Sequence, residues 1–595
     1  MAWKMLPAAS ELFPAIVRAG TATPPRPQPP AARNSPSPTV HRHAPPAARL
    51  GSAGTVLVVD VDGALLLSRS LFPYFMLVAL EAGSFLRGLV LLLLYPAIRC
   101  CYCCLGGGDL AVRAMAAVAF CGLRARTFRA GRAVLPRWLL EDVAAEALEA
   151  ARRVGDPARV VWASAMPRVM VEPFLREYLQ VPAAAAVAAR EMKTAWGFYT
   201  GLMEGGGEDC EATMALMTKR TSAGEGAGDV VGFSAARSVA FLSSSPLAST
   251  CKVVLLVSRV ACFDHQSHAR STAMCLLLLL TTTTISLQEV YVVCPEEKSK
   301  WRRLARRDYP TPLVFHDGRL AFLPTPLNTV AMFTWLPLGA ALAILRLAVA
   351  LALPYKVATA LLAATGQSWR LRGSLPPPGN SGGSGQLYAC NHRTLIDPVY
   401  VSIALDRPVR AVSYSLSRVS DLISPIGATV RLARDRARDG AAMARLLARG
   451  DSVVVCPEGT TCREPYLLRF SPLFAELGGA GGVVPVALAA EASMFYGTTA
   501  SGWKAADPFY FLCNPRVCYT VQFLKRVDTA DVAGDGKKKK AAASSVDVAN
   551  RVQRLIADAL GYECTMLTRK DKYLMLVGND GAVAAPRCRQ RQVTN

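Results

Sequence analysis

Residues 387–398 read LYACNHRTLIDP, a short apolar run followed by a polar turn and a proline. The run predicts a buried β-strand over Leu387–Cys390, so His392 stands where that strand ends. In α/β domains the ends of strands project side chains into a crevice. Asp397 follows after four intervening residues, and around a tight turn its carboxylate can accept a hydrogen bond from one imidazole nitrogen. The other nitrogen is then free to take a proton, which suits general-base catalysis near neutral pH.

Taken alone, a histidine and an aspartate at this spacing favour a structural hydrogen bond over a catalytic pair. The other histidines are poorer candidates for a base. Four of them lie in the N-terminal leader or in an insertion described below, and His316 lies in FHDGRLAF, which is typical of a turn. The catalytic interpretation of His392 therefore needs support from the residues around it.

Short apolar runs and helical patterns alternate on the C-terminal side of this stretch, which predicts an α/β domain over residues 386–580. The segment LPPPGNSGGSG at 375–385 indicates a flexible connector before it, and residues 581–595 form a tail. The expected strands are Val409–Ser413, Ser452–Cys456 and Val483–Leu488, and the expected helices are Ala441–Arg449 and Val546–Leu560.

Three further blocks follow in order: VRLARDR at 430–436, CPEGTTCREPYLLRFSPLF at 456–474 and VPVAL at 484–488. Together with NHRTLID, they resemble the four acyltransferase blocks of glycerolipid-synthesising enzymes. The chain is most similar to the land-plant glycerol-3-phosphate acyltransferases of extracellular lipid synthesis, over roughly residues 54–580. The resemblance implies a C-terminal PlsC-like acyltransferase domain.

The resemblance implies an enzyme that transfers a fatty acyl group from acyl-CoA to the sn-2 hydroxyl of glycerol-3-phosphate, giving lysophosphatidic acid. His392, oriented by Asp397, would remove the proton of the attacking hydroxyl, with no acyl-enzyme. Acyl-CoA is a co-substrate, and neither a cofactor nor a metal is expected. Planar guanidinium groups match phosphate oxygens, and a glycine loop allows close approach of a substrate. The implied substrate-binding residues are Arg431, Arg434, Glu458, Gly459, Thr460 and Arg463.

A second α/β domain is expected over residues 54–325, where TVLVVD at 55–60 predicts a strand that runs into the turn VDGA. Helix patterns at Leu139–Arg153 and Met170–Leu179 flank a second strand pattern at Arg159–Ala163. The sequence DVDGALL resembles the first motif of haloacid-dehalogenase (HAD) phosphatases. That resemblance implies a nucleophilic Asp60, an acid/base Asp62 and a hydroxyl from Ser164.

The third HAD motif departs from the pattern of active phosphatases. Magnesium needs oxygen ligands beyond Asp60, yet residues 232–238 read GFSAARS, without acids, and Arg237 would repel a cation. Asp229 could substitute for the missing acid. The sequence therefore predicts a relic phosphatase and release of lysophosphatidic acid. A bifunctional enzyme that forms monoacylglycerol and a non-catalytic membrane scaffold are the alternatives.

Hydrophobic segments are expected to join the two domains at a membrane. Residues 71–105 are too interrupted by charge for a span and predict a hydrophobic hairpin or an interfacial helix pair. Residues 326–374 contain the best membrane segment, Ala331–Leu353, as one tilted span or a deep hairpin in which Arg346 can snorkel. A buried helix is the alternative. Cysteines 100, 101, 103 and 104 are S-acylated or remain free thiols.

Two other segments fall outside the domains. Residues 1–53 are rich in proline and predict a disordered leader, with an organelle transit peptide as the alternative. Residues 253–288 contain LLLLLTTTTIS and interrupt a pattern that is continuous in the family. Because the segment is in frame, and valine and glutamine codons permit intron-like ends, we interpret it as a retained intron.

Composition limits the partners. The 595 residues are 52% hydrophobic and 19% charged, with a net charge of +23, which favours anionic partners. No stacking motif, zinc-finger spacing or basic recognition helix indicates nucleic acid binding. The expected partners are acyl-CoA, glycerol-3-phosphate and membrane lipid. The expected location is the endoplasmic reticulum membrane, with mitochondria as the alternative.

Overall fold

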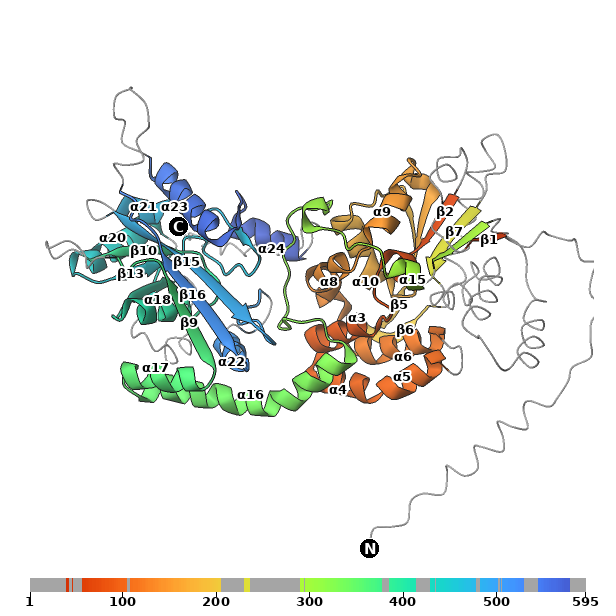
Figure 1. The fold of residues 1–595 in the computed structure, drawn as a ribbon, viewed down its shortest axis with the longest axis horizontal. Helices are drawn as coiled ribbons and strands as arrows, with labels where there is room; N and C mark the ends of the chain where they lie inside the picture. The colour runs from red at the N-terminus through yellow and green to blue at the C-terminus, as the bar shows by residue number, and fades with distance from the viewer. Residues whose placement is uncertain are drawn as a thin grey trace, which may run out of the picture.

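The computed structural model of the chain describes residues 39–41, 45, 56–103, 108–204, 230–235, 289–293, 295–376, 385–413, 429–433, 435–477, 482–500, 503, 506–528 and 544–577. The suspected insertion at 253–288, Asp229, Arg237 and the tail 581–595 lie outside these residues, as does most of the leader. Two domains lie side by side, and a long helix runs beneath both (Figure 1).

The first domain contains a six-stranded sheet in which every pairing is parallel. Its central strands are short, rich in valine and buried, as expected for a parallel sheet with helices on its faces. The predicted strands at 55–60 and 159–163 are confirmed. Three residues of the expected disordered leader form the edge strand β1 instead. The strand order is β1 (Thr39–His41), β8 (Glu289–Val293), β7 (Val230–Ala235), β2 (Val56–Asp60), β3 (Val160–Ala163) and β4 (Ala186–Ala188).

The helices of this domain depart from two predictions. The expected helix at 139–153 is broken after α8, because Asp142 turns inward and accepts hydrogen bonds from the Tyr74 hydroxyl and the Ser68 amide. The expected helix at 170–179 is α10, which continues as a π-helical turn over Phe174–Tyr178. The helices are α3 (Phe72–Leu77), α4 (Phe85–Leu93), α5 (Tyr95–Cys103), α6 (Gly108–Phe120), α7 (Ala130–Ala133), α8 (Leu135–Glu141), α9 (Ala145–Arg152), α10 (Arg168–Pro173) and α15 (Pro295–Lys298), with the hairpin β5 (Met192–Ala195) and β6 (Phe198–Met203).

The hydrophobic stretch 71–105 divides into two parts with different surroundings. All six residues of α3 are buried in the core of the first domain, so this part is not a membrane hairpin. Helix α4 instead buries only Gly88 and Leu91, while the side chains of Leu86 and Leu93 are 72% and 70% exposed. Only the second part therefore remains a candidate for an interfacial helix.

The second domain is built on a seven-stranded mixed sheet, in which β15 and β16 are antiparallel and the other pairs parallel. Strand β10, which ends two residues before His392, is the central strand. The edge strand β9 lies inside the expected membrane segment 326–374. The strand order is β12 (Val430–Arg431), β11 (Arg410–Ser413), β13 (Val453–Val455), β10 (Leu387–Cys390), β15 (Val483–Ala492), β16 (Val517–Phe523) and β9 (Gln367–Arg372).

Helices cover this sheet, and the two predicted ones are confirmed with shifted starts. Helix α20 begins at Arg436, because the Asp435 side chain caps it by accepting from the Arg438 amide. Helix α23 begins after the Ser544 cap and is terminated by the C-cap Gly561, which has a positive φ. The helices are α18 (Asp397–Leu405), α20 (Arg436–Ala448), α21 (Leu473–Leu477), α22 (Asp507–Leu512), α23 (Ser545–Leu560) and α24 (Arg569–Val577), with the small pair β14 (Tyr466–Leu467) and β17 (Glu563–Cys564).

Helix α16 (Pro326–Ala352) is the one helix in the described part of the chain that is long and apolar enough to cross a bilayer. It lies along the lower side of both domains, followed by α17 (Tyr355–Ala364) (Figure 1). It contacts α4 of the first domain and α22 of the second. The long apolar pattern therefore forms a bridging helix with one face on protein.

Arg346 does not snorkel as the sequence suggested. Its side chain is fully buried, and the guanidinium donates to the carbonyl oxygens of Leu512 and Asn514 at 2.6 and 2.7 Å. It also donates to Thr365 Oγ1 at 3.1 Å. These acceptors lie where α17 and α22 end, and the last carbonyls of a helix lack partners of their own. Arg346 thus fastens α16 to the second domain.

We predict that Arg346→Met lowers the unfolding temperature of the full chain. The substitution leaves several buried carbonyl oxygens without donors, at a cost of about 1–3 kcal/mol for each unsatisfied group. Thermal unfolding of the purified protein in detergent measures the effect. Arg372→Met, at an exposed position of β9, is the control and should unfold as the unsubstituted chain does. Equal unfolding temperatures for the two variants would contradict a fastening role.

Candidate active site

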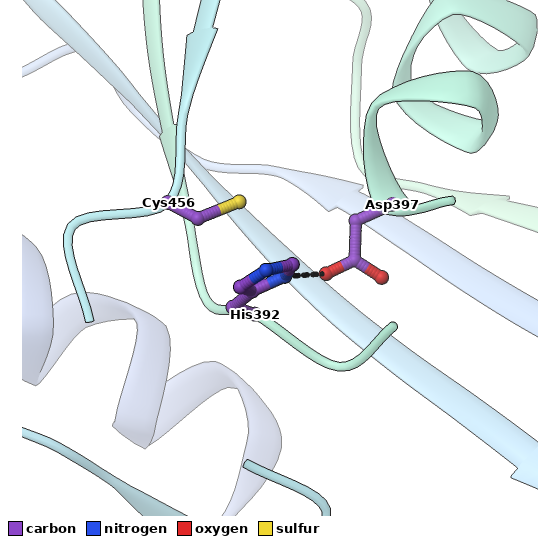
Figure 2. A group of neighbouring side chains, drawn as sticks. All are labelled: His392, Asp397 and Cys456. Atoms are coloured by element: carbon purple, nitrogen blue, oxygen red, sulfur yellow. Dashed lines mark hydrogen bonds and ion pairs between the residues drawn. The ribbon is translucent and has the colours of Figure 1, made fainter. Parts of the chain in front are cut away.

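His392 and Asp397 meet at the carboxyl end of the central strand β10. The imidazole Nδ1 lies 2.8 Å from Asp397 Oδ2, and the histidine side chain is 16% exposed while the aspartate is fully buried (Figure 2). Asp397 is the first residue of α18, so the turn 391–396 carries the chain from strand to helix and folds the carboxylate back onto the ring. The pairing expected from the spacing is present.

The Asp397 carboxylate accepts hydrogen bonds from every side. Besides the imidazole, its donors are the backbone amides of Arg393 and Thr394 at 2.6 and 2.8 Å, the Thr394 hydroxyl at 2.9 Å and the Tyr519 hydroxyl of β16. Because an ionised carboxylate can only accept, Nδ1 of His392 carries the proton. Nε2 is then the nitrogen that carries the lone pair, as a general base requires.

Cys456, which follows β13, is a neighbour of His392 that sequence reasoning missed. Its thiol lies beside the imidazole (Figure 2), and its sulfur is 3.5 Å from the sulfur of Cys390. The hydrogen bond with Cys390 and burial raise the pKa of Cys456 well above its usual value, so the thiol stays protonated. Nothing in the sequence links this cysteine to His392, because β10 and β13 are brought together only by the parallel sheet.

The ionisation of His392 is set by opposing effects. Burial alone would lower its pKa, but interactions with Cys456 and Asp397 raise it well above the value usual for imidazole. Since a protonated thiol carries no charge, we attribute the increase to the carboxylate of Asp397. The same carboxylate that orients the ring therefore also strengthens it as a base.

His392, Asp397 and Cys456 also form a group of possible metal ligands, whose ligating atoms lie within 4.8 Å of one another. The carboxylate of Asp397 is already saturated with donors, and its imidazole contact uses Nδ1. A metal would have to displace those bonds. The arrangement therefore suits a hydrogen-bonded base better than a metal centre.

Glu458 lies close to His392 but faces inward. Its carboxylate accepts from the His392 amide at 2.8 Å and from the Leu468 amide at 3.0 Å, and the side chain is buried. Burial raises its pKa to about 7, against the effect of those two amides. Glu458 thus holds the backbone of the base, whereas the resemblance placed it among the substrate-binding residues.

The next two residues form the expected turn after β13. Gly459 has φ +67°, a conformation that L-residues with a side chain rarely adopt, while a Cβ there would meet no atom within 4 Å. The glycine is therefore required by the backbone conformation and not by crowding. Thr460 is buried beside it.

The three arginines expected at the substrate phosphate are not alike. Arg431 is exposed at the end of β12, and Arg434 lies outside the described residues. Arg463 is buried, and its guanidinium donates to the carbonyl oxygens of Gly318 at 2.8 Å and of Thr498. Arg463 is thus engaged with the segment that connects the two domains.

In the first domain, the three residues that resemble HAD motif residues also converge. Asp62 accepts from the Ser164 hydroxyl at 2.7 Å and from the Ala165 amide at 2.5 Å. Asp60 accepts from the Gly63 amide at 2.9 Å and from the Ser234 hydroxyl at 2.5 Å. Burial and the charge of Asp60 raise the pKa of Asp62 to about 7.

A magnesium ion, which the HAD resemblance implies, fits this set of residues poorly. Ser234 of β7 binds the carboxylate oxygen of Asp60 at the place where the third motif would supply an acid. The Lys298 ammonium is also close, because it donates to the Gly63 carbonyl. Burial lowers the pKa of Lys298, and the charges of Asp60 and Asp62 act against that decrease. Two hydroxyls and two amides thus already bond to these carboxylates, and a cation lies nearby. Sequence reasoning missed Ser234 and Lys298, since neither belongs to an acidic motif.

Two family models match this chain. The family model "Glycerol-3-phosphate acyltransferase RAM2-like, HAD-like domain" matches residues 56–257, and the model "Acyltransferase" matches residues 372–489. A solved 1-acyl-sn-glycerophosphate acyltransferase, PlsC from Thermotoga maritima, is similar over 39% of this chain and 81% of its own, at 13% identity and a TM-score of 0.23.

Full-length relatives are much more similar. The glycerol-3-phosphate acyltransferase RAM2 of Petunia hybrida is 38% identical over 88% of this chain and 97% of its own length. The probable glycerol-3-phosphate acyltransferase 3 of Arabidopsis thaliana is 43% identical over 89% of this chain and 91% of its own length. Similarity of this degree extends through both domains, and the chain therefore belongs to the glycerol-3-phosphate acyltransferase family.

Proposed function

We propose that this chain transfers a fatty acyl group from acyl-CoA to a hydroxyl of glycerol-3-phosphate by direct attack on the thioester. The observation that carries the proposal is the His392–Asp397 pair at the carboxyl edge of the central strand, which leaves the lone pair of the ring on Nε2. Family membership supports the choice of acceptor, because the relatives named above are glycerol-3-phosphate acyltransferases. Attack by the sn-2 hydroxyl rests on the resemblance alone.

In this reaction the acceptor hydroxyl gives its proton to His392 Nε2 while its oxygen attacks the thioester carbonyl carbon. The bond from that carbon to sulfur then breaks, and coenzyme A leaves as a thiolate that takes the proton back from the imidazolium. Asp397 stabilises the imidazolium between these two steps through the Nδ1 hydrogen bond. Arg431, together with Arg434, is the remaining candidate for the substrate phosphate.

We predict that His392→Ala lowers acyl transfer in washed microsomes by about 10²–10⁴-fold, the usual contribution of a general base. Asp397→Asn should also lower the maximal rate, because the amide no longer fixes the Nδ1–H tautomer. Since the neutral imidazole is the active form, the rate falls as pH drops through the pKa of His392. Removing the negative charge lowers that pKa, so the acidic limb of the pH–rate profile moves to lower pH in Asp397→Asn. Unchanged activity in His392→Ala would remove the base from the mechanism.

We further propose that the product keeps its phosphate, so that lysophosphatidic acid is released. Ser234 binds the Asp60 carboxylate where active phosphatases carry an acid, and the ammonium of Lys298 lies near Asp60 and Asp62; both support a first domain that no longer hydrolyses phosphate. A bifunctional enzyme would need those carboxylates to exchange these partners for a metal ion.

We predict that Asp60→Asn changes neither the amount of free phosphate nor the ratio of lysophosphatidic acid to monoacylglycerol. The measurement is chromatographic separation of the products formed by microsomes supplied with glycerol-3-phosphate, acyl-CoA and magnesium. Monoacylglycerol that disappears in Asp60→Asn would show a working phosphatase and overturn the relic interpretation.

We also propose that the enzyme works at a membrane, with the endoplasmic reticulum as the expected location. Exposed apolar side chains are concentrated on helices α4, α16 and α17, which lie along one side of the molecule (Figure 1). Burying a leucine side chain is worth about 1.5–3 kcal/mol, so such a row favours a lipid surface. Since α16 also packs on α22 and is fastened by Arg346, these contacts support a helix that lies in the plane of the membrane.

We predict that the double substitution Leu338→Glu and Leu345→Glu moves part of the protein from the membrane to the soluble fraction. Both side chains are exposed on α16, at 62% and 51%, and each glutamate would place a charge in the lipid. Met566→Glu, at a position that is 69% exposed and precedes α24, is the matched control. Flotation with vesicles containing anionic lipid separates the two cases, and complete retention of the double variant would contradict docking through α16.

A further inference from the structure

The segment FHDGR at 315–319 lies between the two domains and touches both. The amide of Asp317 donates to the Ala133 carbonyl of the first domain at 2.7 Å, and the amide of Ala500 in the second domain donates to Asp317 Oδ1 at 2.9 Å. His316, expected in a turn, is buried. It carries no role in the mechanism above, yet it stands between a cation of one domain and a carboxylate of the other.

The imidazole of His316 connects Arg137 of α8 with Glu464 of the acyltransferase block. Arg137 Nη1 lies 2.6 Å from His316 Nε2, and His316 Nδ1 lies 3.0 Å from Glu464 Oε1. A guanidinium can only donate, so Nε2 accepts and the ring proton must be on Nδ1, where it is donated to Glu464. Arg137 Nη1 also donates to the Tyr496 hydroxyl at 2.6 Å. The three side chains thus form one directed chain of hydrogen bonds across the domain boundary.

The charges of this chain favour the same arrangement. Burial, together with the charges of Arg463 and Arg137, lowers the pKa of His316 to about 3, so the ring is neutral. Burial would raise the pKa of Glu464, but the hydrogen bond from His316 and the charge of Lys572 hold it well below its usual value. The cation Arg137, the neutral imidazole of His316 and the anion Glu464 are therefore linked in that order, and none of them changes its charge near neutral pH.

From Glu464 the connection continues to the catalytic base through backbone atoms. The guanidinium of Arg393, the residue after His392, donates to the carbonyl oxygens of Glu464 at 2.8 Å and of Cys462 at 2.6 Å. The amide of Cys462 donates to the His392 carbonyl at 2.7 Å. The loop 462–464 thus holds the backbone of His392 and the side chain of Arg393, and Glu464 is the residue of that loop whose side chain His316 contacts.

We propose that the first domain serves acyl transfer as a brace, in which Arg137, through His316 and Glu464, positions the loop that holds His392. The inference rests on the proposed acyl transfer and assigns a function to a domain whose own carboxylates are occupied. Arg137, His316 and Glu464 are positioning residues, since none of them contacts His392 itself. Loss of the brace lets the base move relative to the thioester, and a displacement of about 1 Å can cost on the order of 10²-fold in rate.

The test compares Arg137→Met with Arg168→Met in the full chain in microsomes, with wild type and His392→Ala assayed in parallel. Arg137 and Arg168 are matched, with side chains 25% and 30% exposed and ion pairs to glutamates of the first domain, but Arg168 contacts Glu172, Glu191 and the Val187 carbonyl of its own domain. We expect Arg137→Met to lower kcat roughly 10- to 100-fold with little change in KM for either substrate. Arg168→Met should keep the wild-type kcat.

Two further measurements separate positioning from general damage. Arg137→Lys should recover part of the lost kcat, because an ammonium can still donate to one of the two acceptors. The double variant Arg137→Met with His316→Leu should lose no more than the worse of the two single variants, since both interrupt one path. Thermal unfolding of each variant measures whether the fold persists. If Arg137→Met does not fold, the kcat of Arg137→Lys tests the proposal instead.

The proposal is overturned if Arg137→Met, or Arg137→Lys where only that variant folds, has the kcat of wild type. It is also overturned if the loss lies in KM alone, or if the losses of the single variants multiply in the double variant. A wild-type chain that transfers no acyl group would instead refute the proposed function. If wild type is active and His392→Ala is inactive, the proposed function stands. The kinetics of the Arg137 variants then test the brace alone.

Discussion

The hydrogen bond between His392 Nδ1 and Asp397 Oδ2 is the interaction on which the second domain is organised. A buried carboxylate is tolerated only when donors surround it, and here two amides and two hydroxyls join the imidazole around Asp397. One of those hydroxyls belongs to Tyr519 of β16, so the fixed position of the base depends on a strand far away in the sequence. The parallel sheet supplies that precision, because β10 lies between β13 and β15 and Asn391 bonds to the backbone of Leu488.

The two domains illustrate two outcomes for similar chemistry. Both place carboxylates beyond the ends of parallel strands, where side chains converge. In the second domain the carboxylate of Asp397 holds the proton of the imidazole on Nδ1 and leaves the lone pair on Nε2. In the first domain the carboxylates of Asp60 and Asp62 are bound by hydroxyls, with an ammonium nearby. The two sites thus differ in the donors around their carboxylates, and not in the presence of acids.

Helix α16 joins these two domains and also carries several exposed apolar side chains. A helix of 27 residues is about 40 Å long, which would cross a hydrocarbon core of about 30 Å, so length alone favours a span. Its contacts with α4, α17 and α22 and the carbonyl contacts of Arg346 tie it to protein along one side. These contacts favour an orientation parallel to the lipid surface, in which the base and the connecting segment would stay at a fixed height above the bilayer.

The sequence by itself determined the two α/β domains, the strands that precede Asp60 and His392, and the pairing of His392 with Asp397, because each rests on local periodicity or on a spacing of a few residues. Patterns within the chain also indicated that the third HAD motif lacks acids. The tertiary structure alone decided that Glu458 holds the His392 amide, that Arg463 faces the connecting segment and that Arg346 is buried. It also brought Cys456, Tyr519, Ser234 and Lys298 to their sites. The physical reason is that a polar side chain takes the nearest unsatisfied partner in the folded chain, and which partner is nearest depends on strand order and domain packing, which local sequence does not encode.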